Sequence, residues 1–216
     1  MTYLEAINKV LRRLREDEVA SPDTSSYSKL IGEFINDANR LVEDAWDWSM
    51  LRTVTPVSGI TDSSVIVSVT GLTESDKILS VYNITDNVEV QLGSQLGMYN
   101  SVYIEQAPRG RPDNYVTLGQ DSSGNTQVQF YPNSDGSRVV LFNYVGRTPE
   151  LTSGTDVVKA PSTPVVQLAH AMAAEERGET GGTAASKLYA IAQSSLSDAI
   201  AMDAGRFPTE TVWYDV

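Results

Sequence analysis

The chain contains no cysteine and only one histidine among its 216 residues. The absence of cysteine excludes a disulfide framework, a thiolate metal site and a cysteine nucleophile. Long apolar runs are also missing: the longest run of large aliphatic or aromatic residues is Val139 to Phe142, far below the roughly 20 residues that span a bilayer. Because the N-terminus lacks the apolar stretch of a signal peptide, we expect a soluble protein made in a cytoplasm.

Basic residues are scarce relative to acidic ones. The chain has 16 Lys and Arg against 28 Asp and Glu, which gives a formal net charge of −12. This acidity is spread along the whole chain instead of being gathered in one tail. Proteins that grip nucleic acid through its phosphates need clustered Lys and Arg. The composition therefore argues against phosphate-led binding of DNA or RNA.

The first fifty residues show the periodicity of two helices. Thr2 and Glu5 have capping-box spacing, which predicts a helix from about Thr2 to Glu16. The polar stretch 17–24 then breaks the pattern and offers a new N-cap. A second helix is predicted from Tyr27 to Ala45, with five charged residues outside its apolar stripe. The stripe consists of Tyr27, Leu30, Ile31, Phe34, Ala38, Leu41, Val42 and Ala45, and the charged residues are Lys29, Glu33, Asp37, Arg40 and Asp44.

Two tryptophans, Trp46 and Trp48, close this second helix. Their indoles bring more apolar area than one helix face can hide. We therefore predict that both side chains pack in the core, at the junction between the helix and the β segment. Substitution of Trp46 is expected to damage folding.

After Leu51 the periodicity changes from 3.6 to 2, which indicates strands. The clearest hairpin turns are Asp121–Asn125 and Asn133–Gly136, because Gly and Asn accept the positive φ that such turns demand. Short strands at this spacing predict an antiparallel barrel or sandwich. The candidate strands are Arg52–Val57, Ser64–Val69, Lys77–Asn83, Val88–Leu92, Ser101–Glu105, Asn114–Leu118, Thr126–Tyr131 and Arg138–Val145.

Helical periodicity returns after a connection over 148–164 that is rich in Pro, Ser and Thr. It predicts a short apolar helix ending near Gly178 and a longer helix over 183–204. The face of the longer helix is predicted to be Ala184, Leu188, Ile191, Ala192, Leu196, Ala199 and Ile200.

These elements together predict the α+β class. Neither helical pair can bury its stripe alone, so the two pairs are expected to pack as a discontinuous four-helix bundle domain. This domain would comprise residues 1–50 and 161–205, with an inserted antiparallel β barrel or sandwich domain of residues 51–160. An extended C-terminal tail of residues 206–216 follows.

Patterns of catalytic or ligand-binding chemistry are not found in the sequence. His170 lacks the second His and the Glu of a zincin helix, and no Gly-x-Ser-x-Gly elbow occurs. The close carboxylates Asp44 with Asp47, and Glu175 with Glu176, are interpreted as solvated helix surface instead of acid–base pairs. We therefore expect no catalytic residue, metal site or cofactor.

Two segments are candidate contact sites. Arg109 and Arg111 form the densest basic group of the β region, which is typical either of a hairpin tip or strand entry, or of a contact with an acidic partner or with passing nucleic acid. The tail carries four large apolar residues without a helix and spans about 40 Å when extended. It either folds back on its own domain or inserts into another subunit as an added strand or aromatic anchor. Its apolar residues are Phe207, Val212, Trp213 and Tyr214.

The order of these elements resembles that of the head-to-tail adaptor proteins of short-tailed, T7-like bacteriophages, also called tail tubular protein A or gatekeeper. The resemblance covers nearly the whole chain and rests on order and spacing. The chain departs from the T7-like pattern in a longer β segment and in the turn at Gly181-Gly182. The shared pieces are Leu4-x-x-Ile7-Asn8-x-x-Leu11, Ala45-Trp46-Asp47-Trp48, Phe130-Tyr131-Pro132, Tyr144…Leu151-Thr152 and Glu175-Glu176-Arg177-Gly178.

The resemblance implies a structural virion protein without enzymatic activity at the head–tail interface. Twelve copies would form a ring between the portal protein and the tail nozzle, with the tail docked on the portal. Arg109 and Arg111 would then face the nozzle or the DNA channel. Because every copy carries a charge of −12, we expect an acidic or neutral channel wall that lets genomic DNA pass without specific binding.

Two other functions fit the composition. A polysaccharide-degrading tail protein would need two carboxyl groups roughly 5–9 Å apart in a cleft. A carbohydrate- or receptor-binding protein at a tail tip would expose aromatic residues on its β loops, for which Tyr99 and Tyr103 are the nearest candidates.

Overall fold

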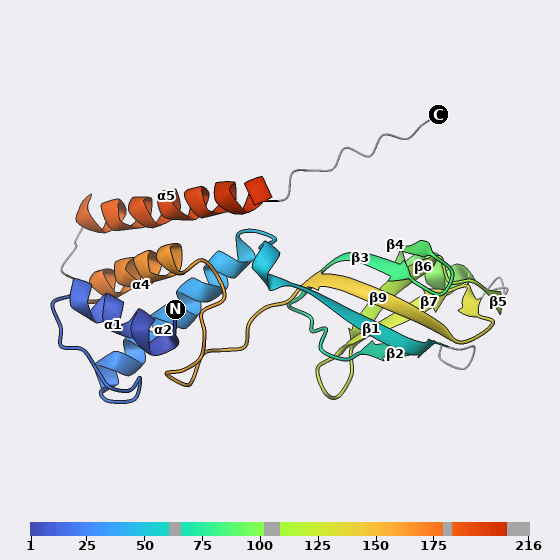
Figure 1. Ribbon diagram of the computed structural model, residues 1–216, viewed down its shortest axis with the longest axis horizontal. Coiled ribbons are helices and arrows are strands. Elements are labelled where there is room, and N and C mark those ends of the chain that lie inside the picture. Colours follow the sequence, from blue (N-terminus) through green and yellow to red (C-terminus); the bar gives the residue numbers. More distant parts are fainter. Residues whose placement is uncertain (61–65, 102–108, 179–182, 207–216) are drawn as a thin grey trace. The chain divides into compact units, whose positions relative to one another are not determined.

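The structure is a computed structural model that describes residues 1–60, 66–101, 109–178 and 183–206. Within this part of the chain it is mixed α+β, with five α-helices and nine strands. The chain divides into two compact units, one of residues 1–51 and 148–216 and one of residues 52–147. We call them the helical unit and the barrel unit, and Figure 1 shows the elements of each.

The helical unit is built around an apolar central helix. Helix α4 contacts α1, α2 and α5, and α1 also contacts α2. Because α4 is surrounded in this way, buried residues lie on all of its sides, among them Val165, Ala169 and Ala171. The described elements of this unit are α1 (Tyr3–Arg13), α2 (Ser26–Asp44), the 3₁₀ turn η1 (Ser49–Leu51), α4 (Ser162–Glu176) and α5 (Thr183–Arg206).

Helix α1 begins with the predicted capping box. The Thr2 hydroxyl accepts a hydrogen bond from the Glu5 N–H at 3.2 Å, and the Glu5 carboxylate accepts one from the Thr2 N–H at 2.9 Å. The helix ends at Arg13, before the predicted Glu16, because Arg15 adopts a φ of 60° that no α-helix can contain.

The predicted charged face of helix α2 is confirmed, whereas its predicted apolar stripe is partly wrong. All five charged residues assigned to the outer face are exposed. Leu41, however, is 52% exposed, whereas the polar residues Asn39 and Glu43 are buried. The stripe is wrong here because the chain segment that returns at 148–151 covers the polar side of α2 instead of Leu41.

This returning segment is held by hydrogen bonds from α2. The Asn36 amide donates to the Leu151 carbonyl and accepts from the Leu151 N–H, both at 3.0 Å. The Glu43 carboxylate accepts from the Thr148 N–H at 3.2 Å and from the Thr148 hydroxyl, and it also accepts from the Asn39 amide at 2.9 Å. These hydrogen bonds lower the cost of burying Glu43 and the amide nitrogen of Asn39, whereas the Asn39 side-chain oxygen is buried without a hydrogen-bond partner among the described residues.

The barrel unit contains a seven-stranded sheet with the strand order β1-β9-β3-β4-β6-β7-β2. The end strands β1 and β2 contact each other, so the sheet is a nearly closed barrel. A small sheet of β5 and β8 lies beside it. The described elements are β1 (Arg52–Ile60), β2 (Ile66–Val69), β3 (Lys77–Asn83), β4 (Val88–Leu92), α3 (Gln95–Tyr99), β5 (Arg109–Gly110), β6 (Asn114–Gln120), β7 (Thr126–Tyr131), β8 (Asn133–Ser134) and β9 (Arg138–Val145).

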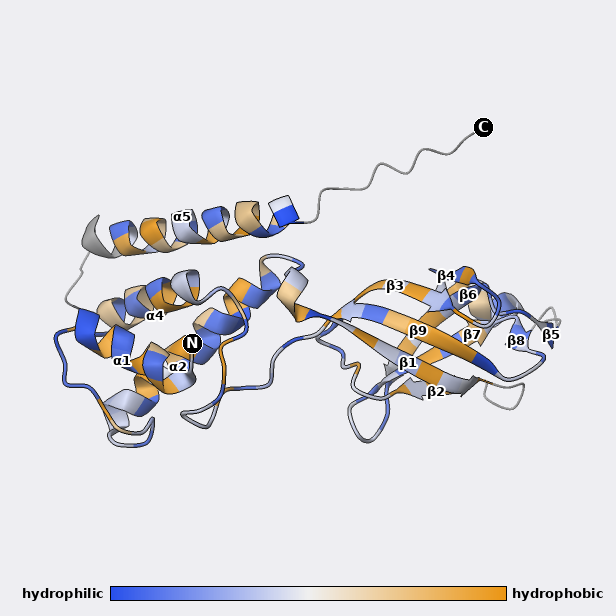
Figure 2. Cartoon of the chain, viewed as in Figure 1, coloured by the Kyte–Doolittle hydropathy of each residue, from blue (hydrophilic) through white to orange (hydrophobic). Residues whose placement is uncertain are grey.

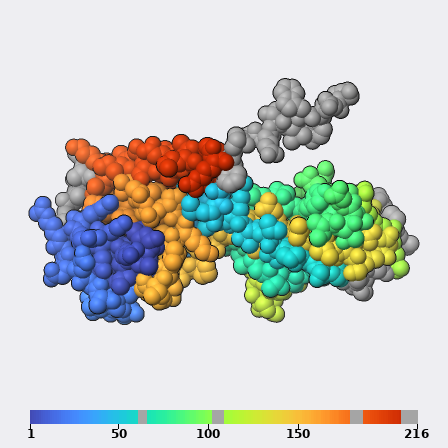
Figure 3. All heavy atoms as spheres, viewed as in Figure 1, coloured from blue at the N-terminus to red at the C-terminus, as the bar shows by residue number. Residues whose placement is uncertain are grey.

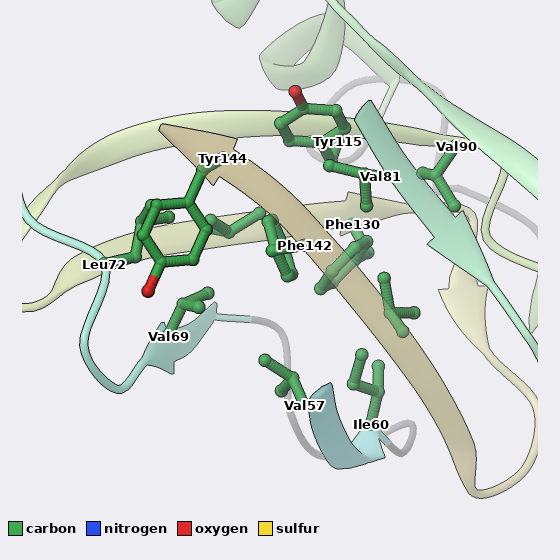
Figure 4. Packing of buried hydrophobic residues seen from close by; sticks show 12 residues of the cluster. Val57, Ile60, Val69, Leu72, Val81, Val90, Tyr115, Phe130, Phe142 and Tyr144 are labelled. Carbon is green, nitrogen blue, oxygen red and sulfur yellow. The ribbon is translucent and has the colours of Figure 1, made fainter. Parts of the chain in front are cut away.

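Apolar side chains from these strands fill the barrel interior. Phe142 is fully buried and lies edge-on to Tyr115 and Phe130, with ring centroids 6.1 and 6.2 Å apart. Figure 4 shows this cluster, with Val57 and Ile60 at its β1 side. Figure 2 shows hydrophilic and hydrophobic residues mixed along the same strands, as one buried face requires.

Several predicted strands are confirmed, but some of the predicted turns and strand pairings are wrong. The hairpin turn at 121–125 joins the paired strands β6 and β7. The predicted hairpin at Asn133–Gly136 is wrong, since β7 and β9 are not neighbours in the sheet and Asn133 belongs to β8. The predicted antiparallel sheet also needs correction: β4 and β6 pair in parallel, and α3 and β5 lie between them in the chain, as a parallel pair requires an intervening connection. Helix α3 was not predicted, and most of the predicted strand Ser101–Glu105 lies outside the described residues.

In the described part of the chain, no helix combines the length and the apolar character needed to cross a membrane.

Candidate functional site

Helix α5 carries the predicted docking tail. It runs two residues beyond the predicted end, to Arg206. Figure 3 shows α5 on the surface of the helical unit. The predicted docking residues Phe207, Val212, Trp213 and Tyr214 lie outside the described residues.

The predicted buried face of α5 is partly wrong. Ala192 is buried, whereas Ile191 is 53% exposed. The difference follows from the packing, because α5 lies along α4 and only one side of it is covered.

A buried aspartate, Asp203, anchors the C-terminal end of α5. It is only 5% exposed. Its Oδ2 accepts hydrogen bonds from the Trp46 indole at 3.2 Å and from the Ser49 N–H at 3.0 Å, and its Oδ1 accepts one from the Ser49 hydroxyl at 2.5 Å. These bonds tie α5 to the turn that follows α2. One feature of the sequence indicates this role: Asp203 follows Ala199 and Ile200 at helical spacing, which places an acidic residue on the predicted apolar face.

The surroundings of Asp203 favour its charged form. Burial by itself would raise the pKa of this carboxyl, but the hydrogen bonds from Ser49 and Trp46, together with the positive charge of Arg206, hold the pKa below its ordinary value. Asp203 is therefore a charged anchor at neutral pH.

This pKa shift predicts a pH-dependent anchor. A carboxyl with a lowered folded pKa stabilises the fold above its unfolded pKa of about 3.9, and this contribution is lost as pH falls through the folded pKa. We expect Asp203→Asn to lower the free energy of unfolding by about 1–3 kcal/mol at neutral pH, with a smaller difference from the wild type at about pH 3. Urea unfolding at both pH values measures this. Asp198→Asn is the matched control, because Asp198 is exposed on the same helix; equal losses in both variants would contradict the anchor.

The Glu175-Glu176-Arg177-Gly178 piece has a structural role in the helical unit. Arg177 donates to the Leu14 carbonyl at 3.1 Å and pairs with Glu16. Glu175 accepts a hydrogen bond from the Tyr189 hydroxyl at 2.6 Å, which ties α5 to α4. Partial burial, this hydrogen bond and the Glu175 charge raise the pKa of Tyr189 to about 12.

The two tryptophans occupy different environments. Trp48 is fully buried, and its indole donates to the Val42 carbonyl at 2.7 Å. Trp46 is 39% exposed. Its predicted core position is therefore wrong, because α2 ends at Asp44 and the indole remains partly exposed while it donates to the buried Asp203.

Arg109 and Arg111 lie on and just after β5, and both are exposed. The backbone of Gly110 between them accepts a hydrogen bond from the Asp135 N–H at 3.3 Å, and the Asp135 carboxylate pairs with Arg138 at 2.7 Å. Arg109 thus lies on the small β5–β8 sheet and Arg111 directly follows β5, and their contact with a partner or with DNA remains a prediction.

A pocket of about 450 Å³ in the barrel unit tests the hydrolase alternative. Two carboxylates line it, Glu74 and Asp76. Asp76 is already used by the fold, since it accepts from the Thr73 N–H at 2.6 Å, the Thr73 hydroxyl at 3.0 Å and the Arg147 N–H at 2.8 Å. A carboxylate held in this way stabilises a turn, and the pocket gives the hydrolase alternative no support.

The other candidates for chemistry have structural surroundings. His170 is half-buried, and burial together with Arg13 lowers its pKa. Asp121 accepts from the N–H groups of Ser123 and Asn125 and so shapes the hairpin turn. Across the described residues, no group of three or more His, Asp or Glu could hold a metal ion. Of the candidate receptor-binding aromatics, Tyr99 is 45% exposed at the end of α3, and Tyr103 lies outside the described residues.

In a comparison with protein families, the model of the family described as SU10 adaptor protein matches residues 1–211. A comparison with curated proteins found no match.

Proposed function

Because the chain belongs to the SU10 adaptor protein family, we propose that it is a structural protein of a bacteriophage virion, an adaptor between the head and the tail. In this proposal, copies of the chain form a twelve-membered ring that joins the portal protein to the tail nozzle. The ring lines the channel through which DNA is ejected. The family match along residues 1–211 is the observation that carries the proposal.

The architecture is compatible with such a role. An adaptor subunit needs a stiff layer for side-by-side packing and a second body to receive the next ring. We assign the first role to the helical unit, as a four-helix domain, and the second to the barrel unit, as a domain inserted within it. Buried polar ties such as Glu43 to Thr148 support the stiffness of the helical unit.

In this proposal the tail binds the portal, and the net negative charge keeps DNA from binding to the ring. Residues 207–216 dock on the portal through Phe207, Val212, Trp213 and Tyr214, while Arg109 and Arg111 face the nozzle or the DNA channel. The net charge of −12 on every copy repels DNA over a Debye length of roughly 10 Å. This repulsion lets the genome slide through the ring without specific binding.

The proposal is tested by measuring the mass of the complex formed with the portal protein of the same phage. Native mass spectrometry or sedimentation of the mixture should give one species with twelve copies of this chain on each portal ring. The two proteins measured alone are the controls. Absence of a complex, or a complex with no fixed stoichiometry, would refute the adaptor ring.

A further inference from the structure

We propose that an exposed apolar patch at the end of α5 binds the chain's own segment 207–216 before the protein joins its partner. The patch consists of Trp46, Met50 and Met202, and we call it the α5-end patch. The identity of the partner that later takes the segment rests on the proposed function, whereas the binding of the segment to the patch does not.

The three residues of the α5-end patch lie beside the Asp203 anchor. Trp46 bonds to Asp203 directly, Met202 is the residue before Asp203, and Met50 follows Ser49, whose N–H and hydroxyl both donate to Asp203. The three apolar side chains are 39%, 46% and 69% exposed for Trp46, Met50 and Met202. Three large exposed apolar residues around one anchor are the kind of surface at which another apolar group can be buried.

The chain length and its starting point identify the occupant. Segment 207–216 begins directly after Arg206, about one helical turn from Met202. Fully extended, its ten residues reach about 33 Å, far more than the distance to the patch. The tether raises the local concentration of the segment to the millimolar range, which a second molecule in dilute solution does not match.

The composition of the segment fits the patch. Phe207, Val212, Trp213 and Tyr214 place four large apolar side chains among ten residues. Methionine and tryptophan adapt well to such side chains, since the thioether packs favourably against aromatic rings. The same four residues are those that dock on the portal in the proposed function, so the two sites compete for them.

This competition has a quantitative consequence. If the segment is bound to the patch in about nine molecules of ten, the apparent affinity for the portal is about tenfold weaker than the intrinsic affinity. The α5-end patch therefore delays portal binding and keeps the apolar segment away from other copies.

The first experiment uses the absence of cysteine from the chain. The paired substitutions Met50→Cys with Tyr214→Cys should form a disulfide within one molecule under mild oxidation. The control pair is Ser197→Cys with Tyr214→Cys: Ser197 is exposed and within reach, but it lies about 140° around α5 from Met202. We expect the Met50 pair to form at least ten times faster. Equal rates, or disulfides only between molecules, would overturn the proposal.

The second experiment measures portal affinity. The double variant Met50→Asp with Met202→Asp should keep its circular dichroism spectrum and bind the portal about tenfold more tightly, because the segment is released. Ile191→Asp, an exposed apolar residue elsewhere on α5, should leave the affinity unchanged. Weaker or unchanged affinity of the double variant would overturn the proposal. If the wild type does not bind a portal, the proposed function fails while the disulfide result still decides whether the segment binds the patch.

Discussion

Trp48→Ala should lower the free energy of unfolding of the helical unit by about 3–5 kcal/mol. The Trp48 side chain is fully buried, so its loss leaves a large cavity in an interior that relaxes only in part. The indole hydrogen bond to the Val42 carbonyl at 2.7 Å is lost as well. Urea unfolding, together with hydrogen exchange of the amides in residues 1–51 and 148–178, measures the effect.

Trp46→Ala is the matched control for this prediction. Trp46 is 39% exposed and contributes one hydrogen bond to Asp203, so its loss should cost only about 1–2 kcal/mol. Equal destabilisation by the two variants would show that the two indoles contribute alike, against their different burial.

Local patterns in the sequence predicted local structure well. The capping box at Thr2 and Glu5 needs only residues three apart, and it forms as predicted. Strands β3 and β7 begin and end at the predicted residues, because alternation and turn residues are also local signals. Gly124 adopts the positive φ expected of its hairpin turn, at 82°.

Contacts between distant residues account for the errors. Burial of Asn39 and Glu43 depends on Thr148, which is more than 100 positions further along the chain. Helical periodicity carries no information about such a distant partner, so it assigns Leu41 to the buried stripe and leaves out Asn39 and Glu43. The parallel pairing of β4 and β6 likewise depends on a crossover whose path the strand pattern does not encode.

The same distinction between local signals and distant contacts applies to the candidate site. The sequence predicts a docking tail from four apolar residues, and these lie outside the described residues. It leaves Arg109 and Arg111 open between a strand entry or hairpin tip and a partner contact, and Arg109 lies on β5 with Arg111 just after it. It does not identify Asp203, because the residues that donate hydrogen bonds to this carboxylate, Trp46 and Ser49, lie more than 150 positions earlier in the chain. It also placed Trp46 in the core, although that indole lies at the surface beside this anchor.

Removal of the docking segment should have the largest effect on assembly. We expect deletion of residues 207–216 to abolish portal binding, with an affinity loss of at least about a hundredfold, because aromatic anchors carry most of the energy in such interfaces. The helical unit should stay folded, since α5 keeps its ties through Asp203 and Tyr189. Co-sedimentation with the portal measures binding, and circular dichroism measures folding.

A variant of unchanged length separates the loss of apolar anchors from the loss of chain. Substitution of serine at Phe207, Val212, Trp213 and Tyr214 keeps the reach and the charge of the segment while removing the side chains that dock. It should bind the portal as poorly as the deletion does, because the binding energy comes from burying these side chains in apolar pockets. Normal portal binding by the deletion variant would refute the docking role of the segment. Normal binding by the serine variant alone would instead assign that role to the backbone of the segment, as an added strand.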